Sequence, residues 1–291
     1  MPNGLFVGMV TLDLVYLSSK LPSNNEKIAA SDYTISAGGP ATNAAVTFGY
    51  LGNRATLLTV LGSHPITQLI RRDVERYGVT IADLDPNATN PPPVSSIIVT
   101  EDTGERAVIS INAAKIQARA DQIPPGIDAG VDLILIDGHQ MMVSSAIAKR
   151  CCKEIAKLAK ANRIPVIIDG GSWKPGFETI LPLVDYAICS ANFYPPGCYH
   201  RTEVFAYLTE MGIPHIAITQ GEKPLQYLSL GESGEILVPQ IQAVDTLGAG
   251  DIFHGAFCHY ILQENFIQAL EAAAQIAANS CTFFGTRQWM E

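Results

Sequence analysis

The sequence predicts an α/β protein in which helices cover both faces of a doubly wound, mostly parallel sheet. In the second half of the chain, short apolar runs alternate with longer helical runs, which is the order of βα units. The expected strands are residues 131–136, 164–169, 186–189 and 213–219, and the expected helices are residues 144–161 and 202–211. Ligands of such sheets bind beyond the carboxyl ends of the strands. We therefore expect a single domain, residues 1–291, with its site at that edge.

Composition limits the kind of protein that this chain can be. It has 291 residues, of which 47% are hydrophobic and 16% are charged, so it can bury a large core. The formal net charge is −9 and lysine and arginine form no long run, which argues against nucleic acid as a partner. No apolar run reaches the roughly 18 to 20 residues that span a bilayer. We therefore expect a cytoplasmic protein without a membrane partner.

The cysteine and histidine patterns predict no structural metal site. The six Cys show no CxxC spacing, and the six His show no HExxH or other paired spacing. Most of the cysteines lie in apolar surroundings, where a reduced thiol behaves as a small hydrophobic group. A structural zinc site is therefore not expected.

The first third of the chain contains a strand and two hairpins. An apolar run over residues 4–10 predicts a first strand that ends near Asp13. Residues 14–37 and 94–112 each carry alternating stretches around a polar turn, which predicts two hairpins. From these residues alone, Asp13 is either a turn aspartate or a ligand-binding carboxylate.

A helix is expected between the hairpins. Gly38 and Gly39 precede Pro40, and a helical run follows to residue 51. Two glycines before a proline at the first helical position predict a helix N-terminus that a ligand can approach closely. A strand over residues 54–61 and a helix ending at residue 78 follow.

The most informative stretch is residues 245–251, with the sequence DTLGAGD, ahead of an apolar helix that starts at Ile252. The small residues Gly248, Ala249 and Gly250 allow close backbone approach, and the first-turn N–H groups of a helix attract an anion, most often phosphate. A carboxylate such as Asp251 beside that anion can accept a proton from an attacking hydroxyl. The alternative is that Asp251 is only a helix-capping acid.

The motif matches, at every specified position, the second signature D-T-x-G-A-G-D of the ribokinase family of carbohydrate kinases, the PfkB-type sugar kinases. Residues 36–45, far earlier in the chain, resemble the first signature, GG-x-x-x-N-x-A, in which Gly39 and Asn43 meet the sugar. The resemblance covers essentially the whole chain. It implies a ribokinase-like fold and an ATP-dependent kinase that phosphorylates a hydroxyl of a sugar or sugar-like molecule, with Asp251 as general base and residues 248–250 as the anion hole.

The resemblance also implies an acceptor site under a small β lid. Asp13 corresponds to a carboxylate that grips sugar hydroxyls, and Asn25 and Arg106 would help to position the acceptor. The two hairpins correspond to strands that leave the main sheet and close over the sugar. Because such edge strands need cover, we also expect that they can pair in a homodimer. The lid strand over residues 95–111 most resembles the branch that contains ketohexokinase and sulfofructose kinase.

Two segments are expected to hold the nucleotide phosphates. Thr219 and Gly221 resemble the family segment T-x-G-x-x-G, although its final Gly is Pro224 in this chain. By the same resemblance Gly248 and Gly250 approach the phosphates.

The last expected helix, residues 266–284, is rich in alanine, including Ala274 and Ala278. Small side chains permit close packing over a flat adenine. They equally permit close packing against another helix with no ligand.

The metal positions depart from the family pattern. Asn192 matches the Asn of the family segment N-x-x-E, whose Glu helps to organise magnesium, but that Glu is Pro195 in this chain. We expect Mg²⁺ nonetheless, with Asp169 orienting metal-bound water. The resemblance also implies a monovalent cation, K⁺, near Asp245.

Two other functions remain open at this stage. A nucleoside kinase has the same fold. A non-catalytic nucleotide or sugar sensor is of a different class, and the absence of Glu at Pro195 favours it. The intact Asp251 argues against a sensor, since a sensor has no use for a base at that position.

Overall fold

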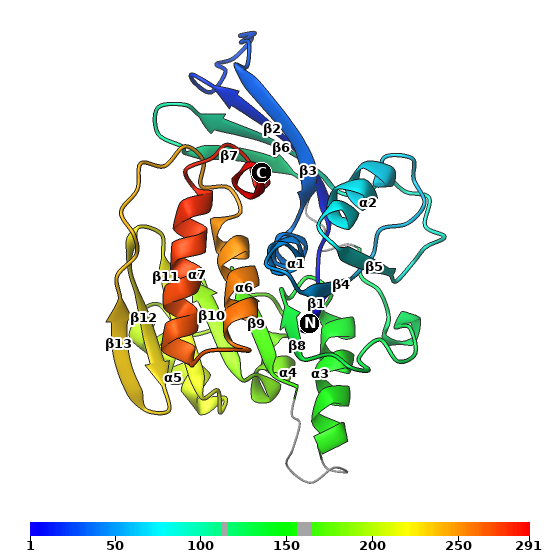
Figure 1. The fold of residues 1–291 in the computed structure, drawn as a ribbon, viewed down its shortest axis with the longest axis vertical. Helices are drawn as coiled ribbons and strands as arrows, with labels where there is room; N and C mark the ends of the chain where they lie inside the picture. The colour runs from blue at the N-terminus through cyan, green and yellow to red at the C-terminus, as the bar shows by residue number, and fades with distance from the viewer. Residues whose placement is uncertain (112–115, 156–163) are drawn as a thin grey trace.

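The computed structural model describes residues 1–111, 116–155 and 164–291, apart from the side chains of residues 152–155 (Figure 1). A large sheet carries helices on both faces, and a smaller sheet stands above one of its edges (Figure 1). The large sheet with helices on both faces confirms the predicted fold class. The predicted helix over residues 144–161 starts at Met141, and its second half, from residue 156, lies outside the described residues.

The large sheet has nine strands within the described residues. In spatial order they are β13 (Glu232–Ile236), β12 (Lys223–Ser229), β11 (His215–Gln220), β10 (Tyr186–Ser190), β9 (Val166–Gly170), β8 (Leu133–Ile136), β1 (Asn3–Val7), β4 (Arg54–Thr59) and β5 (Val79–Asp83). β12 is antiparallel to both of its neighbours, and the other pairs are parallel. β1 lies between β4 and β8, which the chain reaches in opposite directions. The winding therefore reverses beside β1, where ligands of such sheets bind.

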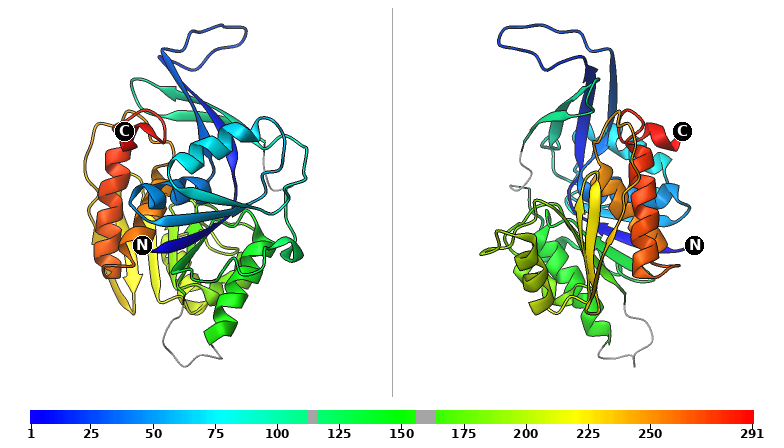
Figure 2. Two further views of the ribbon diagram at one scale, coloured as in Figure 1. Left: turned by 45° about the vertical axis from the view of Figure 1, so that its right-hand side comes forward. Right: turned by 90° about the vertical axis from the view of Figure 1, so that its left-hand side faces the viewer.

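The helices form one layer on each side of this sheet (Figure 2). One layer contains α1 (Pro40–Tyr50), α2 (Thr67–Arg76), α6 (Ala249–Tyr260) and α7 (Phe266–Ser280), and the other contains α3 (Met141–Ile155), α4 (Phe177–Ile180) and α5 (Arg201–Glu210). Short 3-10 helices cover Ala120–Gln122, Leu181–Leu183 and Gln288–Met290. Alternate residues of β1 enter opposite cores: Phe6 packs with α1 and α6, whereas Leu5 and Val7 pack on the other face.

Local sequence explains where the helices next to the site begin. Pro40 occupies the first turn of α1 after Gly39, and Gly248 precedes α6 in the left-handed conformation, with φ of 71°. Asn265 caps α7 by accepting a hydrogen bond from the Gln268 N–H at 3.0 Å. α6 begins at Ala249, earlier than the expected Ile252, and α7 ends at Ser280 rather than at residue 284.

The smaller sheet is built from the two predicted hairpins. Its strands lie in the order β3 (Asp32–Gly38), β2 (Thr11–Ser18), β6 (Val94–Thr100) and β7 (Arg106–Ser110). β2 and β6 pair in parallel, and the two hairpin pairs are antiparallel. We call this sheet the lid sheet. Residue 112, the predicted end of the second hairpin, lies outside the described residues.

One prediction about the first strand is wrong. β1 ends at Val7, and Asp13 is the third residue of β2 in the lid sheet rather than the end of the first strand. The chain leaves the main sheet at Gly8, where a side chain would collide with Asp137: a Cβ there would lie 2.1 Å from an Asp137 carboxylate oxygen.

None of the helices within the described residues is long and apolar enough to cross a membrane.

Candidate functional site

The motif of residues 245–251 forms the loop before α6 and its first turn. A side chain at Gly248 would be strained, because φ is 71° there and a Cβ would lie 2.7 Å from Thr286 Cγ2, which would have to shift. Gly250 faces open space, since a Cβ at that residue would have no heavy atom within 4 Å. The first-turn N–H groups of an α-helix have no partner within the helix. Gly250 and Asp251 therefore offer backbone donors at the start of α6, whereas the Ala249 N–H already donates to the Thr246 carbonyl at 3.4 Å.

Asp251 is the carboxylate at this helix start. Burial of the carboxylate, together with the negative charge of Asp169, raises its pKa to about 7. A hydrogen bond from Asn43 Nδ2 to Asp251 Oδ2, 2.8 Å long, and the nearby His254 act in the opposite direction. A carboxylate with such a pKa is ionised in part at neutral pH and can accept a proton there.

Asn43 brings the other predicted signature to the same point. It lies in the first turn of α1, is 3% exposed, and reaches Asp251 although 208 residues separate the two in sequence. Gly39, the residue before α1, has φ of 103°, and a Cβ there would lie 2.4 Å from the Met9 carbonyl oxygen. The structure thus places Asn43 beside the start of α6, and the Gly39 carbonyl accepts from the Asn43 N–H at 2.9 Å. A sugar contact of these two residues stays a prediction.

Asp13 lies on the lid strand β2 and is buried. Burial raises its pKa, while hydrogen bonds from Thr11 and Ser95 and the charge of Arg287 lower it. The Thr11 Oγ1 to Asp13 Oδ1 distance is 2.7 Å. Asp13 contributes to the raised pKa of Asp251 through its negative charge, so the two carboxylates lie in one electrostatic neighbourhood.

The lid contacts the motif directly through Arg106. Arg106 Nη1 donates to Thr246 Oγ1 at 2.9 Å and to the Thr246 carbonyl at 3.3 Å. Thr246 Oγ1 in turn lies 3.4 Å from the carbonyl of Gly104 in the β6–β7 turn. Asn25 is different: it is exposed, with φ of 60°, in the long loop between β2 and β3 that stands out from the molecule (Figure 2).

Asp169 lies at the end of β9, buried beside His254 of α6. His254 Nδ1 is 2.7 Å from the Gly250 carbonyl and 3.4 Å from Asp169 Oδ2, and its Nε2 is 3.1 Å from the Ile188 carbonyl. Both ring nitrogens therefore face acceptors, and the ring ties the first turn of α6 to β9 and β10. Within the described ranges, no group of three or more His, Cys, Asp or Glu is arranged to hold a metal ion.

Asp245 holds the motif against the C-terminal segment. Its Oδ1 accepts from the Leu247 N–H at 2.8 Å, and its Oδ2 accepts from the Gly285 N–H at 2.9 Å. Burial raises its pKa, and the two backbone donors and Arg106 lower it. Its carboxylate thus already has a structural role at the position where a monovalent cation was predicted.

The predicted nucleotide residues lie on several elements. Thr219 lies in β11, next to its last residue, and Gly221 follows in the turn to β12 with φ of 63°. Asn192 is exposed just after β10, where its N–H donates to Ser190 Oγ at 3.0 Å. Ala274 and Ala278 of α7 are only 4% and 7% exposed. Their burial favours close packing of α7, and an adenine contact at these two residues stays a prediction.

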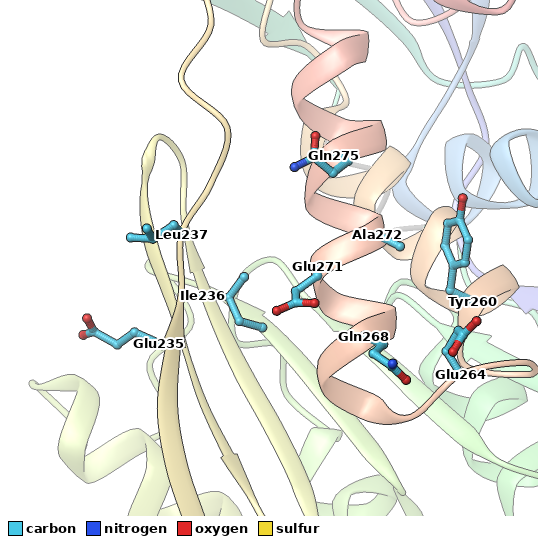
Figure 3. A pocket seen from close by; sticks show the side chains of 9 residues that line it. All are labelled: Glu235, Ile236, Leu237, Tyr260, Glu264, Gln268, Glu271, Ala272 and Gln275. Atoms are coloured by element: carbon cyan, nitrogen blue, oxygen red, sulfur yellow. The ribbon is translucent and has the colours of Figure 1, made fainter.

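A groove of about 720 Å³ lies between β13 and α7 (Figure 3). Its lining residues are Glu235, Ile236, Leu237, Tyr260, Glu264, Gln268, Glu271, Ala272 and Gln275. Three of them are glutamates, which repel phosphate groups. None of the residues assigned above to the sugar or the nucleotide lines it, so this groove is separate from the cluster around Asp251.

Two residues that organise the site received no role from the sequence, although Asp137 falls at an expected strand end. Asp137, just after β8, accepts hydrogen bonds from the N–H groups of Met9 and Ala41 at 2.9 and 3.2 Å. Burial raises the pKa of this carboxyl, but His139 and the backbone donors outweigh burial and lower the pKa below its usual value. Arg287, near the C-terminus, donates to Asn43 Oδ1 at 2.9 Å. A strand-end Asp signals a possible site, whereas nothing around Arg287 in the sequence indicates its burial.

Comparison with known proteins shows the family of this chain. The family model for the pfkB family carbohydrate kinase matches residues 1–291. Ribokinase of Bacillus subtilis strain 168 is 25% identical over 100% of this chain and 96% of its own length, and ketohexokinase of Mus musculus is 22% identical over 97% and 96%. These two identities, 25% and 22%, differ too little to assign the chain to the ribokinase or the ketohexokinase branch of the family.

Solved structures share the fold. The structure of Arabidopsis thaliana ribokinase complexed with ribose and ATP superposes with a TM-score of 0.75 at 21% identity, covering 98% of this chain and 93% of that one. A match of the family model over the whole chain, with both signatures in one cluster, identifies the protein's class. The chain belongs to the pfkB family of carbohydrate kinases, and it is an ATP-dependent carbohydrate kinase.

Proposed function

We propose that this kinase transfers the terminal phosphoryl group of ATP to a hydroxyl of a small sugar, with Asp251 as the general base. The observation that carries the proposal is the position of Asp251: a carboxylate with a pKa of about 7 in the first turn of α6, beside backbone donors and open space at Gly250. A base works best when its pKa is near the working pH. The acceptor hydroxyl would give its proton to Asp251 as its oxygen attacks the phosphorus.

The anion hole of the proposal is the turn of residues 248–250. Gly248 takes the left-handed conformation that turns the chain into α6, and the first-turn N–H groups then point out along the helix axis. Fixed donors aimed at developing charge stabilise a transition state without reorganising during the reaction. Thr286 packs against Gly248 and Arg106 holds Thr246, so the turn is supported from two sides.

The acceptor would lie between this turn and the inner face of the lid sheet. The strand registers put Asp13, Ser36, Ser95 and Ser110 in one row across the four lid strands. A row of hydroxyls and one carboxylate offers both donors and acceptors to the hydroxyl groups of a sugar. Asp13, with Gly39 and Asn43 at the start of α1, would fix which hydroxyl of the acceptor faces Asp251.

The other two predicted acceptor residues have narrower roles in the proposal. Arg106 donates to Thr246 through Nη1, so it would act on the acceptor only through the N–H groups that this contact does not use. Asn25, in the exposed loop, would reach an acceptor only if the lid moves on binding.

The donor side of the proposal uses the carboxyl ends of β9 to β11. Asn192, Thr219 and Gly221 lie at or just beyond these strand ends and would contact the nucleotide phosphates, with residues 248–250 at the transferred group. Mg²⁺ usually binds one or two carboxylates together with substrate phosphates and water rather than a protein cage, and Asp169 at the end of β9 fits that pattern. When bound, Mg²⁺ would neutralise phosphate charge. K⁺ at Asp245 remains part of the proposal by family resemblance.

We also propose that the outer face of the lid sheet pairs with a second copy of the chain. By register, Tyr16, Tyr33, Ile35 and Ile109 share this face, and they are 41%, 64%, 45% and 76% exposed. Large exposed apolar patches mark interaction sites. Gel filtration across a range of concentrations is expected to give a dimer; a monomer throughout would remove this part of the proposal.

Buried thiols support the proposed cytoplasmic location. Cys189, Cys198, Cys258 and Cys281 are buried and form no disulfide, which is typical of a reducing compartment.

Purified protein with ATP, Mg²⁺ and a panel of D-ribose, 2-deoxy-D-ribose, D-fructose and adenosine tests the function. Acceptor-dependent release of ADP with one of the sugars is expected. Release with adenosine alone would favour a nucleoside kinase. Tight ATP binding without release for any acceptor would favour a sensor.

A further inference from the structure

Arg287 occupies the junction between the lid, α1, α2 and the C-terminal segment. It is 8% exposed. Its Nε and Nη2 donate to Asp73 Oδ2 of α2 at 3.1 and 3.0 Å, and Nη2 also donates to the Ala37 carbonyl of β3 at 2.7 Å. Its Nη1 donates to Asn43 Oδ1 and to Thr286 Oγ1, both at 2.9 Å. A guanidinium has five N–H groups, and these five contacts use them all.

This arrangement leaves Arg287 no donor for a phosphate or an anionic sugar. An arginine that binds a ligand needs N–H groups free on the ligand side, usually two in parallel. Arg287 instead makes all of its hydrogen bonds to the protein. Its influence on the reaction must therefore pass through the groups that it holds.

Arg287 fixes which end of the Asn43 amide faces Asp251. Arginine can only donate, so the Asn43 atom that meets it must be the carbonyl Oδ1. The amide Nδ2 is then left to donate to Asp251 Oδ2 at 2.8 Å. If the amide turned over, its carbonyl oxygen would face a carboxylate oxygen, which is repulsive.

The same guanidinium also fixes the root of the lid. Ala37 lies next to the last residue of β3, shortly before the start of α1. Its carbonyl accepts from Arg287 Nη2, and its N–H donates to Asp73 Oδ2 at 2.9 Å. The Arg287–Asp73 pair therefore holds both backbone polar groups of one lid residue and, through Asn43, one oxygen of Asp251.

We propose that Arg287 is a positioning residue that keeps the Asn43 amide turned toward Asp251 and ties the lid strand β3 to the same point. The inference rests on the proposed function, in which Asp251 is the base. With Oδ2 occupied by Asn43, the other carboxylate oxygen, Oδ1, is the one that faces the acceptor hydroxyl. Arg287 thus determines the geometry of proton transfer without touching a substrate.

The competing explanation is that the Arg287–Asp73 pair only stabilises the fold. The chain offers a matched control for it: Arg71 of the same α2 helix pairs with Asp83 at 2.8 Å and donates to the Gly62 carbonyl, with no contact to Asn43 or Asp251. Removing either arginine leaves a partly buried Asp with backbone N–H donors but without its ion-pair partner. A purely structural role predicts that both changes lower the melting temperature. It also predicts that each folded variant keeps the kcat of the wild type.

The first experiment measures kcat, sugar KM, ATP Kd and melting temperature for Arg287→Met, Arg287→Lys and Arg71→Met. Each is assayed with whichever of D-ribose or D-fructose the wild type phosphorylates. Misplaced catalytic groups cost up to about a hundredfold in rate, so Arg287→Met is expected to lower kcat at least about tenfold. ATP Kd should stay within about threefold, since Arg287 lies on the acceptor side of Asp251. Arg71→Met should keep wild-type kcat.

Arg287→Lys keeps the charge beside Asp73 but cannot reach Asn43, Ala37 and Asp73 at once. It should therefore also lower kcat, and it gives the same answer if the Met variant does not fold. Both Arg287 variants should also move the rise of kcat to higher pH, because the Asn43 hydrogen bond lowers the pKa of Asp251 and would be weakened.

A double-mutant cycle tests whether Arg287 acts through Asn43. In an Asn43→Ser background, Arg287→Met should lower kcat by a clearly smaller factor than in the wild type, because the amide orientation that it maintains no longer exists and only its contact with the lid strand is left to lose. The same loss in both backgrounds, or a kcat unchanged in both Arg287 variants, would overturn the inference. Asp251→Asn in the same series separates this from the function itself: full turnover by that variant contradicts the proposed base, whatever Arg287 does.

Discussion

Replacing Asp251 by Asn removes the proposed base with little change of shape. Asn is similar in size and also favours helix starts, so α6 and the turn of residues 248–250 should be kept. Asn43 Nδ2 can still donate to the carbonyl oxygen of the introduced amide. What is lost is proton acceptance, which typically contributes about 10² to 10⁴ in rate. We therefore expect kcat to fall by that factor, while ATP Kd stays the same or improves as a negative charge leaves the phosphate site.

The same substitution has a signature in stability. Burial raises the pKa of Asp251 from 3.8 to about 7 in the folded protein. Its neutral form is therefore the one that the fold favours, and stability from this group is complete below pH 3.8 and is lost as pH rises through about 7. The shift corresponds to roughly 4 kcal/mol at most. Asn stays neutral, so the variant should melt above the wild type at about pH 8, and the difference should vanish toward about pH 4.

The assay compares kcat, ATP Kd and melting temperature of Asp251→Asn with those of Asp121→Asn. Asp121 is an exposed acid in the first turn of a 3-10 helix, where it pairs with Arg119, and its replacement tests the effect of losing a helix-start carboxylate away from the site. Its kcat should match the wild type. If Asp251→Asn remains folded and keeps turnover within a few fold of the wild type, Asp251 is not the base and the reasoning fails.

Three further predictions concern the acceptor, pH and metal. Asp13→Ala should raise sugar KM about tenfold to a hundredfold, because a buried hydroxyl loses a charged partner, with ATP Kd unchanged; equal loss of both affinities would contradict the assignment. Turnover should rise with pH through about 7, since Asp251 must be ionised to accept a proton, and a flat kcat from about pH 5 to 9 would contradict this. Excess EDTA should abolish turnover and replacing K⁺ by Na⁺ should lower it; full activity in EDTA, or indifference to K⁺, would remove the respective metal from the proposal.

Local patterns predicted most of the main sheet. Buried parallel strands are short apolar runs, and the helices between them carry the βα order, so β8 to β11 could be predicted from residues 131–219. Gly and Pro marked the starts of α1 and α6 because those positions need a special backbone conformation.

The edges of the sheet were harder to predict. β12 and β13 are antiparallel additions with polar residues on many positions, such as Gln226 and Glu235, which form a hydrogen bond across the two strands at 2.8 Å. β5, at the other edge, is only partly buried. A strand with one solvent-exposed face and few apolar residues has a weak hydrophobic pattern, so it is hard to predict from its own residues.

The site itself divides in the same way. Asp251 could be singled out because it follows a turn of small residues at a helix start, and Asn43 could be singled out only through its match to the first family signature. Arg287 was not found, since its role depends on Ala37, Asn43 and Asp73, which lie on three different elements and meet only in the folded chain. Placing Asp13 at the end of the first strand was wrong because the apolar run continues across the break at Gly8 into the lid.

The most direct test of the central claim is the fate of the phosphoryl group. Wild-type protein with ATP, Mg²⁺ and each of D-ribose, 2-deoxy-D-ribose and D-fructose is followed by phosphorus NMR. The account predicts one equivalent of a sugar phosphate monoester for each ADP formed with at least one sugar, and no ADP without an acceptor. ADP and inorganic phosphate without a sugar ester, or bound ATP that no sugar causes to turn over, would contradict it.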